Sequence, residues 1–225
     1  MVEKIIKTNK FHKDTFDKTT EERRQNVLKV AIEEFASKGY NATSINDISK
    51  KAQISIGAMY SYFASKEDLF LSIVNNAYIL MDDILRDVED NSNDIFDCVK
   101  MMIKASRKFA IEYPHLNRIY LDITTQALSH MSIKLSNTLE IITPQILNKY
   151  ISKAKMEGKI SSDLNENVAA FCIDNIFTMY QFSFSSDYYK ERLKIYVGDD
   201  NLNNIDKLED SIFKFIMSGI FGDIL

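Results

Sequence analysis

Apolar residues recur every three or four positions along nearly the whole chain, which is the spacing of one helical face. Between Thr19 and Gly39 this spacing predicts a helix of about 20 residues, with Gly39 as the residue that ends it. Two segments of about eight residues follow, 44–52 and 55–62, with a short turn between them. Three helices in this order are typical of a helix-turn-helix, whose last helix enters the major groove of DNA.

Helix-capping residues stand at the expected starts of several segments. A side chain that accepts a hydrogen bond from the backbone three residues further on, with an acidic residue at that position, indicates a helix N-terminus. The pattern occurs at Thr19, Ser44, Ser65 and Asp163. We therefore expect a helix to begin at each of these four residues.

Longer helices are predicted beyond residue 65. One begins at Ser65, and another begins at Asp94 and stops at Pro114. Further helices are expected over 116–127, over 132–157 with a kink or break at Pro144 and an end at Gly158, from Asp163 to Phe184, and over 204–221. Residues 187–203 are interpreted as a long connection with one helical turn at most.

Turn residues are scarce, with six Gly and two Pro among 225 residues. A many-stranded sandwich or barrel needs a turn roughly every 8–12 residues, so the composition excludes such folds and predicts an all-α chain. Cys98 and Cys172 fit neither a disulfide framework nor zinc spacing, and we expect no metal or cofactor.

Other classes of protein find no support in the chain. Its lysine-dotted start lacks the apolar segment of a leader, and no apolar run is long enough to span a membrane, so we expect a cytoplasmic protein. The chain lacks a G-x-S-x-G turn and any nucleophile paired with a base, so we expect no enzyme.

The candidate DNA contacts gather around the two short helices. Hydroxyls and free backbone N–H groups at a helix N-terminus suit a phosphate, and a first turn with small residues can approach base edges closely. The expected phosphate contacts are Thr43, Ser44, Tyr60, Tyr62 and Lys66, and the residues expected nearest the bases are Ser55, Ile56, Gly57 and Ala58. The expected core of this head is Ile48, Ala52, Ile54, Met59 and Phe63.

Residues 27–69, which read VLKVAIEEFASKGYNATSINDISKKAQISIGAMYSYFASKEDL, resemble the DNA-binding domain of the TetR-type transcriptional regulators. Positions that carry the resemblance include Gly39, Tyr40, Thr43, Gly57, Tyr60, Tyr62, Phe63 and Lys66, and it continues weakly at 158–170. The resemblance implies an all-α homodimer. It also implies a three-helix helix-turn-helix domain at the N-terminus, with the DNA contacts named above. A larger C-terminal domain of about nine helices would bind a small effector and dimerise.

Two residues depart from the family's pattern. Gln53 stands at the turn position where the family usually has glycine, and a positive φ there would cost on the order of 1 kcal/mol. Ile56 stands where a basic or polar side chain is frequent. Because an apolar side chain can pack on a thymine methyl group but makes no bidentate contact with guanine, we expect an A·T-leaning half-site.

The net charge of −4 is unevenly distributed. Residues 1–75 hold 12 Lys/Arg against 10 Asp/Glu, net +2, whereas residues 76–225 are net −6. A mildly basic head is expected to rely on hydroxyls and backbone N–H groups for many phosphate contacts, which predicts a shallow dependence of DNA binding on salt.

Aromatic and Met side chains are frequent on the C-terminal helices. Each alone suits a packed core, and together they suit an apolar cavity lined by helices. The residues expected to line an effector pocket are Met102, Phe109, Tyr113, Tyr120, Phe177 and Tyr180. The helices expected over 166–186 and 204–221 are apolar on more than one side, so by family analogy they should pair with a second copy as a four-helix bundle.

We therefore expect a polar arm over 1–18, a helix-turn-helix DNA-binding domain over 19–65, and an effector-binding and dimerisation domain over 66–225. The expected function is that of a sequence-specific transcriptional regulator, a repressor that a small apolar effector releases from a palindromic operator. Its expected partners are double-stranded DNA, a second copy and the effector, with no membrane. Two alternatives stay open: a helical ligand-binding or scaffold protein whose helix-turn-helix does not read DNA, and an activator of the same family without a small ligand.

Overall fold

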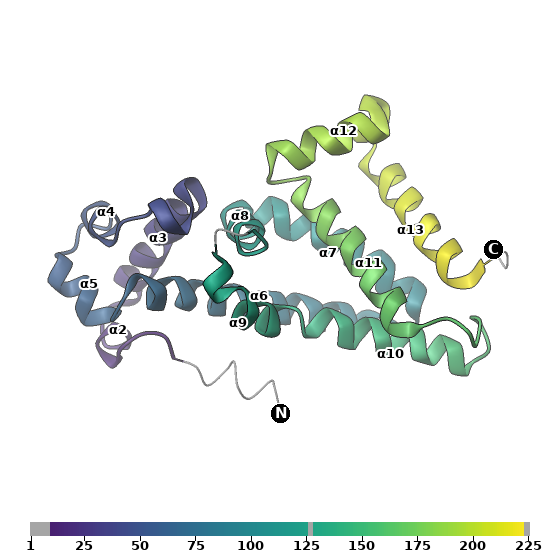
Figure 1. The fold of residues 1–225 in the computed structure, drawn as a ribbon, viewed down its shortest axis with the longest axis horizontal. Helices are drawn as coiled ribbons and strands as arrows, with labels where there is room; N and C mark the ends of the chain where they lie inside the picture. Colours follow the sequence, from purple (N-terminus) through teal and green to yellow (C-terminus); the bar gives the residue numbers. More distant parts are fainter. Residues whose placement is uncertain (1–9, 126–127, 223–225) are drawn as a thin grey trace. The chain divides into compact units, whose positions relative to one another are not determined.

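The computed structural model describes residues 10–125 and 128–222, and these residues form helices and no strand (Figure 1). In chain order the helices are α2 (Asp14–Asp17), α3 (Glu21–Ala42), α4 (Ile45–Lys51), α5 (Ile56–Tyr62), α6 (Lys66–Asn91), α7 (Ile95–Glu112), α8 (Pro114–Ile123), α9 (Ser129–Leu139), α10 (Ile142–Met156), α11 (Glu166–Phe182), α12 (Asp187–Leu202) and α13 (Ile205–Phe221). The predicted all-α fold is confirmed. None of the described helices combines the length and apolarity that crossing a membrane requires.

The helices pack as two compact units. The first holds the described residues up to Met81 together with Arg118–Thr138, and the second holds Asp82–Asn117 and the described residues from Leu139 onward. The first unit contains α3, α4 and α5, which succeed one another in the order expected for a helix-turn-helix (Figure 1).

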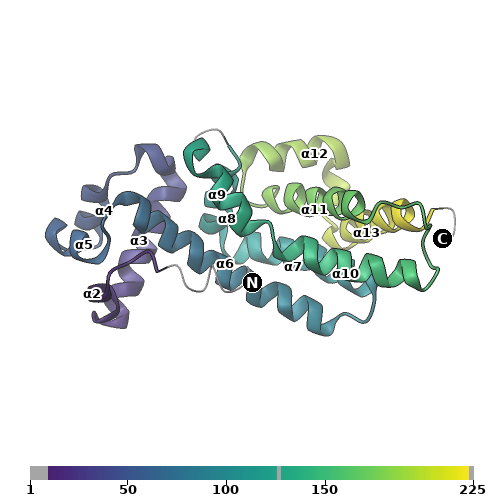
Figure 2. The ribbon, with the colours of Figure 1, turned by 60° about the horizontal axis from the view of Figure 1, so that its bottom comes forward.

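In the second unit, α7 is the central helix. It packs against α10, α11 and α13, and α10 packs against α11 (Figures 1 and 2). The apolar face predicted for α7 is buried through Ile95, Val99, Met102 and Phe109, as the periodicity required. Burial of that face against three neighbours is the hydrophobic term that holds this unit together.

Several predicted helix boundaries are confirmed. Ser44 and Asp94 are the N-cap residues of α4 and α7, and the Ser65 hydroxyl accepts a hydrogen bond from the Asp68 N–H at 3.0 Å. Gly39 has a φ of 75° and interrupts the helical backbone of α3 where the helix was expected to end. The chain leaves α7 just before Pro114, which begins α8.

Two predicted caps are wrong by one or two residues. The N-cap of α3 is Thr20 rather than Thr19, and that of α11 is Asn165 rather than Asp163. In both places several capping residues stand close together in the sequence. Local spacing alone does not decide among them, because each can accept the same kind of bond.

The expected break near Pro144 is present but falls before the proline. Helix α9 ends at Leu139 and α10 starts at Ile142, so Pro144 lies in the first turn of α10. A proline is tolerated there because N–H groups of a first turn have no partner within the helix. Helix α8 ends at Ile123, and residues 126–127 of the predicted 116–127 segment lie outside the described residues.

The prediction of a loop over 187–203 is wrong. These residues form α12, a helix of 16 residues in which Gly198 has a φ of 76°. None of its residues is fully buried, and its apolar residues include half-buried Tyr189, Leu193 and Val197 as well as exposed Tyr188, Ile195 and Tyr196, so they mark no single apolar face.

Candidate nucleic-acid interface

The turn between α4 and α5 has a defined backbone geometry. The Gln53 N–H donates to the Lys50 carbonyl at 3.1 Å, and the Ile54 N–H donates to the Ser49 carbonyl at 3.0 Å. This pair of bonds is a Schellman motif, which places its C′ residue in the left-handed region. That residue is Gln53, with a φ of 56°, the one described residue other than glycine with a positive φ. The positive φ considered at this departure from the family pattern is therefore present at Gln53.

The first turn of α5 faces solvent. Ser55 is its N-cap, and its hydroxyl accepts a hydrogen bond from the Ala58 N–H at 3.0 Å. Ser55, Ile56 and Gly57 are exposed, Ile56 by 41%, while Ala58 is half-buried. One turn further on, Tyr60 is 48% exposed. The helix therefore presents its N-terminal turn and Tyr60, as a recognition helix must.

The inward face of the same helix belongs to the core. Met59 and Phe63 are fully buried with Ile48 and Ala52, whereas Ile54, the fifth expected core residue, is half-buried.

Tyr62 is also buried, with its ring 5.3 Å from that of Phe16. Tyr62 was expected at a phosphate, but its side chain packs within the head.

Thr43 and Ser44 take different roles at the start of α4. Ser44 caps the helix, and its hydroxyl accepts from the Asn46 N–H at 3.2 Å, so it lies beside the free N–H groups of the first turn. Thr43 is only 3% exposed, and its hydroxyl donates to the carbonyls of Gly39 (2.7 Å) and Glu34 (3.1 Å). The Thr43 hydroxyl thus points inward and ties the end of α3 to the start of α4, an orientation that does not favour the expected contact with a phosphate.

Lys66 likewise has partners inside the head. Its ammonium donates to the carbonyls of Tyr40 at 2.8 Å, Thr43 at 3.1 Å and Asn41 at 3.4 Å. It also lies 4.4 Å from the centre of the Tyr40 ring. Because an ammonium has three N–H groups, these bonds use its donors on the carbonyls at the end of α3. The cation predicted to meet a phosphate instead caps a helix C-terminus, where positive charge is favoured.

A buried carboxylate joins α3 to α4. Glu34 is 3% exposed and accepts hydrogen bonds from the ammonium groups of Lys38 at 2.8 Å and of Lys51 on α4. The Lys38 ammonium, followed by that of Lys51, holds the pKa of Glu34 below its ordinary value. The short helix α4 is thus fixed to the long one by charge as well as by apolar packing.

Residues 13–16, which were expected to belong to a polar arm, contact α5. The Lys13 N–H donates to the Tyr62 carbonyl at 2.8 Å, and the Lys13 ammonium donates to the Tyr60 carbonyl at 2.8 Å. The Thr15 hydroxyl donates to the Ser61 carbonyl. Phe16, in the short helix α2, is buried 4.7 Å from the Phe63 ring. The sequence signal for these contacts was weak, because Phe11 and Phe16 are the only apolar residues of the polar stretch 10–18. Residues 1–9 of the arm lie outside the described residues.

The six candidate pocket residues fall in both units. Met102, Phe109, Phe177 and Tyr180 are buried in the second unit, and Tyr113 is half-buried there. Tyr120 belongs to the first unit. The hydroxyl of Tyr180 donates to Glu209 Oε1 at 3.1 Å, and Arg107 Nε donates to the same oxygen at 2.7 Å. Burial, followed by the charge of Glu209, raises the pKa of the Tyr180 hydroxyl.

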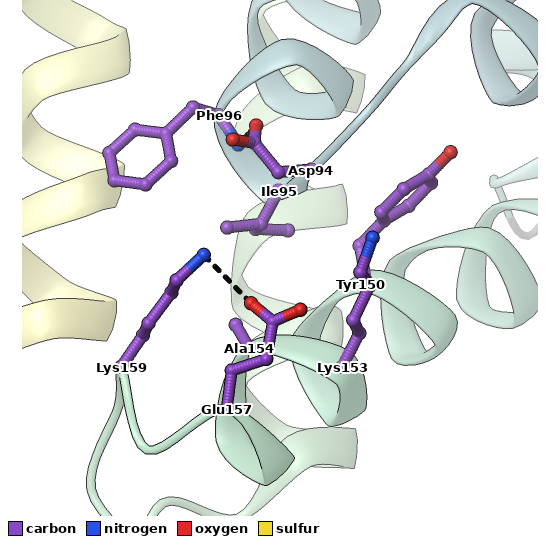
Figure 3. Close-up of a pocket in the computed structure, with 8 residues that line it drawn as sticks. All are labelled: Asp94, Ile95, Phe96, Tyr150, Lys153, Ala154, Glu157 and Lys159. Atoms are coloured by element: carbon purple, nitrogen blue, oxygen red, sulfur yellow. Dashed lines mark hydrogen bonds and ion pairs between the residues drawn. The ribbon is translucent and has the colours of Figure 1, made fainter.

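A small pocket of the second unit lies between the start of α7 and the end of α10 (Figure 3). Its lining residues are Asp94, Ile95, Phe96, Tyr150, Lys153, Ala154, Glu157 and Lys159, and none of them is an effector-pocket candidate. The Lys159 ammonium and the Glu157 carboxylate pair across it at 2.7 Å (Figure 3). The pocket holds about one water-sized molecule, far less than the volume of a typical ligand site. In the part of the chain that the structure describes, no group of three or more His, Cys, Asp or Glu side chains is placed to hold a metal ion.

The fold and the exposed first turn of α5 define a helical protein with an N-terminal helix-turn-helix. Residues 27–73 match the sequence profile of the bacterial regulatory proteins of the TetR family. The chain is 27% identical over 199 residues to the regulator YvdT of Bacillus subtilis, covering 88% of this chain and 95% of YvdT. It is 47% identical over 57 residues to YuxN of the same organism, a match that spans 25% of this chain and only 20% of YuxN.

Solved structures share the fold. A TetR family regulator from Chloroflexus aurantiacus superposes with a TM-score of 0.70 at 20% identity, covering 93% of this chain and 98% of that one. FadR from Bacillus subtilis, solved in complex with stearoyl-CoA, has a TM-score of 0.67 at 18% identity, with 87% and 98% covered. Residues 27–73 thus form a DNA-binding domain of the TetR type, and the described chain shares its overall fold with solved TetR family regulators.

Proposed function

We propose that this protein is a cytoplasmic, homodimeric repressor that binds a palindromic operator and leaves it when a small apolar effector binds. The observation that carries the proposal is the first turn of α5. It combines a capped N-terminus with three exposed residues, Ser55, Ile56 and Gly57, on a helix whose other face is fixed in the core. Side chains so placed can meet base edges while Ser44 and Tyr60 contact the flanking phosphates.

Selection from a random-sequence duplex library tests this role. The wild-type protein should enrich a two-fold symmetric sequence, with half-sites about one helical turn apart because the two heads of a dimer occupy successive major grooves. Tyr60→Ala should weaken binding to the enriched duplex and to a scrambled duplex alike, since a phosphate contact carries no sequence information. Failure of the wild-type protein to enrich any sequence would contradict DNA reading and leave a ligand-binding or scaffold role.

Ile56 supports the proposed A·T preference. Its side chain is 41% exposed at the start of α5, where it can pack on a thymine methyl group. Ile56→Arg should shift the selected base at that position from T towards G. The control Ile133→Arg adds the same charge at an exposed site of α9 and should leave the selected sequence unchanged. A G·C-rich half-site for the wild-type protein would contradict the preference.

Exposed apolar residues on α11 and α13 support the proposed dimer. Phe171 is 69% exposed and Phe215 72% exposed, and Val168 lies one turn before Phe171. Phe171 is thus a surface residue of the single chain rather than part of its core. Helices α11 and α13 both pack against α7, and large exposed apolar side chains on such helices are typical of surfaces that a partner covers.

Sedimentation measures the dimer directly. Phe171→Glu and Phe215→Glu should each shift the equilibrium towards monomer by burying a charge in the interface. Met156→Glu is the matched control, because Met156 is 83% exposed on α10, outside the proposed interface. A Phe171→Glu variant that stays as dimeric as the control would contradict the assignment.

An apolar effector would act from the second unit. Four of the six candidate pocket residues are buried there, and the related fold of FadR was solved with stearoyl-CoA bound. We therefore propose an apolar or acyl-chain ligand, and long-chain acyl-CoA is the first probe. By linkage, the probe should weaken operator binding by the same factor by which the operator weakens binding of the probe. A probe that binds tightly without changing operator affinity would contradict release by that ligand. Operator binding that activates transcription in a reporter would contradict repression.

A further inference from the structure

The recognition helix α5 ends on carbonyls that the N-terminal segment satisfies. A helix leaves its last four carbonyls without partners inside the helix, and in α5 these belong to Met59, Tyr60, Ser61 and Tyr62. The Met59 carbonyl accepts from the Phe63 N–H at 2.9 Å. The other three accept from residues 13 and 15: Tyr60 from the Lys13 ammonium, Ser61 from the Thr15 hydroxyl and Tyr62 from the Lys13 N–H.

This segment has its own anchor. Phe16 is 3% exposed and lies against the rings of Tyr62 and Phe63, at 5.3 and 4.7 Å between ring centres. Helix α2 therefore packs directly on α5, and Figure 1 shows the two side by side at the end of the first unit. An apolar anchor beside three donors fixes the position of the donors, which otherwise would be mobile in a chain end.

We propose that residues 13–16 act as a cap that positions the recognition helix for reading bases, and we call this set the α5 cap. The inference rests on the proposed DNA-binding function. Helix α5 has only seven residues, too few to be stable by itself, so its direction depends on what holds its two ends. Ser55 holds the N-terminal end and the α5 cap holds the C-terminal end. Loss of the cap would let the helix fray and would disorder the exposed turn that meets the bases.

Lys13 also has a competing interpretation as a phosphate ligand. In the structure its ammonium is directed at the Tyr60 carbonyl rather than outward, which favours the cap. The two roles differ in their salt dependence. A phosphate contact contributes about one unit to the slope of log K against log salt concentration, whereas a cap that acts through α5 contributes nothing to the slope.

The test uses Thr15, an exposed residue whose replacement leaves the core intact. Thr15→Val removes the hydroxyl with little change of shape, and Thr15→Ser keeps it. The probes are the duplex that the wild-type protein enriches from a random library and a scrambled duplex of the same composition. Thr15→Val should bind the enriched duplex about fivefold more weakly, the value of one hydrogen bond, while Thr15→Ser should match the wild type. Binding to the scrambled duplex should not change in either variant.

Lys13→Met should weaken specific binding similarly and leave the salt slope unchanged. Lys18→Met is the control, since it removes the same charge from an exposed position of the same segment. Amide exchange at residues 59–63 should accelerate in Thr15→Val and not in Thr15→Ser. A salt slope lowered by about one in Lys13→Met would overturn the cap in favour of a phosphate contact. Unchanged specific affinity in Thr15→Val would overturn the positioning role.

The results that would contradict the proposed DNA-binding function differ from those that would contradict the α5 cap. If the wild-type protein enriches no duplex, DNA reading is wrong and the positioning role falls with it, while amide exchange still shows whether the cap stabilises α5. If the wild-type protein enriches a duplex and Thr15→Val binds it equally well, only the cap is wrong.

Discussion

Replacing Gln53 by glycine should stabilise the head. Gln53 occupies the left-handed C′ position of the Schellman motif that ends α4, with a φ of 56°. Its side chain is exposed and forms no hydrogen bond with any described residue, so the substitution removes the strain and little else. The same motif ends α10, where the C′ residue is Gly158 with a φ of 68°. The Schellman motif therefore occurs with the favoured glycine at C′ in α10, at Gly158, and with Gln53 in its place at the end of α4.

The expected magnitude follows from two opposing terms. A residue with a side chain in the left-handed region costs roughly 1–2 kcal/mol relative to glycine. Glycine gains more conformational entropy in the unfolded chain, which offsets about 0.4–1 kcal/mol of that relief. The midpoints of the two ranges, about 1.5 and about 0.7 kcal/mol, give a net gain for Gln53→Gly of about 0.8 kcal/mol. It corresponds to about 2–3 °C in the melting temperature of a domain of this size, where 1 kcal/mol shifts the midpoint by about 2–4 °C.

The reciprocal substitution supplies the control. An added Cβ at Gly158 would have no atom within 4 Å, so Gly158→Gln adds backbone strain without a steric clash and should cost about as much as Gln53→Gly gains. Urea unfolding at one protein concentration measures both changes. Amide exchange should place the gain in α4 and α5 and the loss near the end of α10. The reasoning is refuted if Gln53→Gly is neutral or destabilising while Gly158→Gln is destabilising, because the strain would then be absent at Gln53.

Three further changes test the electrostatics and the thiols. Burial, helped by the charge of Glu140, raises the pKa of Asp174 from about 3.8 to about 6. Ionisation of Asp174 therefore lowers the stability of the fold as the pH rises between these values. In urea titrations, Asp174→Asn should raise the unfolding free energy by about 3 kcal/mol at pH 7 and by little near pH 4. Partners hold the pKa of Glu34 low, so Glu34→Gln should destabilise the head by about 1 kcal/mol at neutral pH and by less in acid, whereas exposed Glu33→Gln should be neutral in the same melts. Burial raises the pKa of Cys98 to about 12, so a thiol reagent should leave Cys98 unlabelled in the folded protein and label it once urea unfolds the chain; labelling of Cys98 in the folded protein would contradict this burial.

Elements with a strong local pattern could be predicted from sequence. The spacing of Val27, Ala31 and Phe35 fixes the buried face of α3, and all three are buried. The turn and recognition helix were also located, because Ser44 and Ser55 cap short helices that share one core. Helices predicted from such patterns are present in the structure because local capping and burial favour the same helical conformation.

Side-chain direction within the head could not be predicted. Thr43, Tyr62 and Lys66 all stand where the family resemblance implies phosphate contacts, and each has its partners inside the head. Their orientation depends on carbonyls and rings brought close by tertiary packing, which spacing along the chain does not report. Helix α12 was missed for a related reason, because none of its residues is fully buried and its apolar side chains mark no single buried face.

The use of lysine inside the head also bears on how it would meet DNA. Lys13 and Lys66 each direct the ammonium group at carbonyls of a helix C-terminus, and Lys51 pairs with buried Glu34. These cations neutralise the negative ends of helices and a carboxylate. They therefore add less to the electrostatic attraction of DNA phosphates than the net charge of +2 over residues 1–75 suggests. At the first turns of α4 and α5 and at Tyr60, the groups available to a duplex include hydroxyls and the N–H groups of helix N-termini, at Ser44, Ser55 and Tyr60. Neutral donors of this kind position a duplex without releasing many counterions, so the affinity of this head for DNA should depend on the fit of α5 in the groove more than on ionic strength.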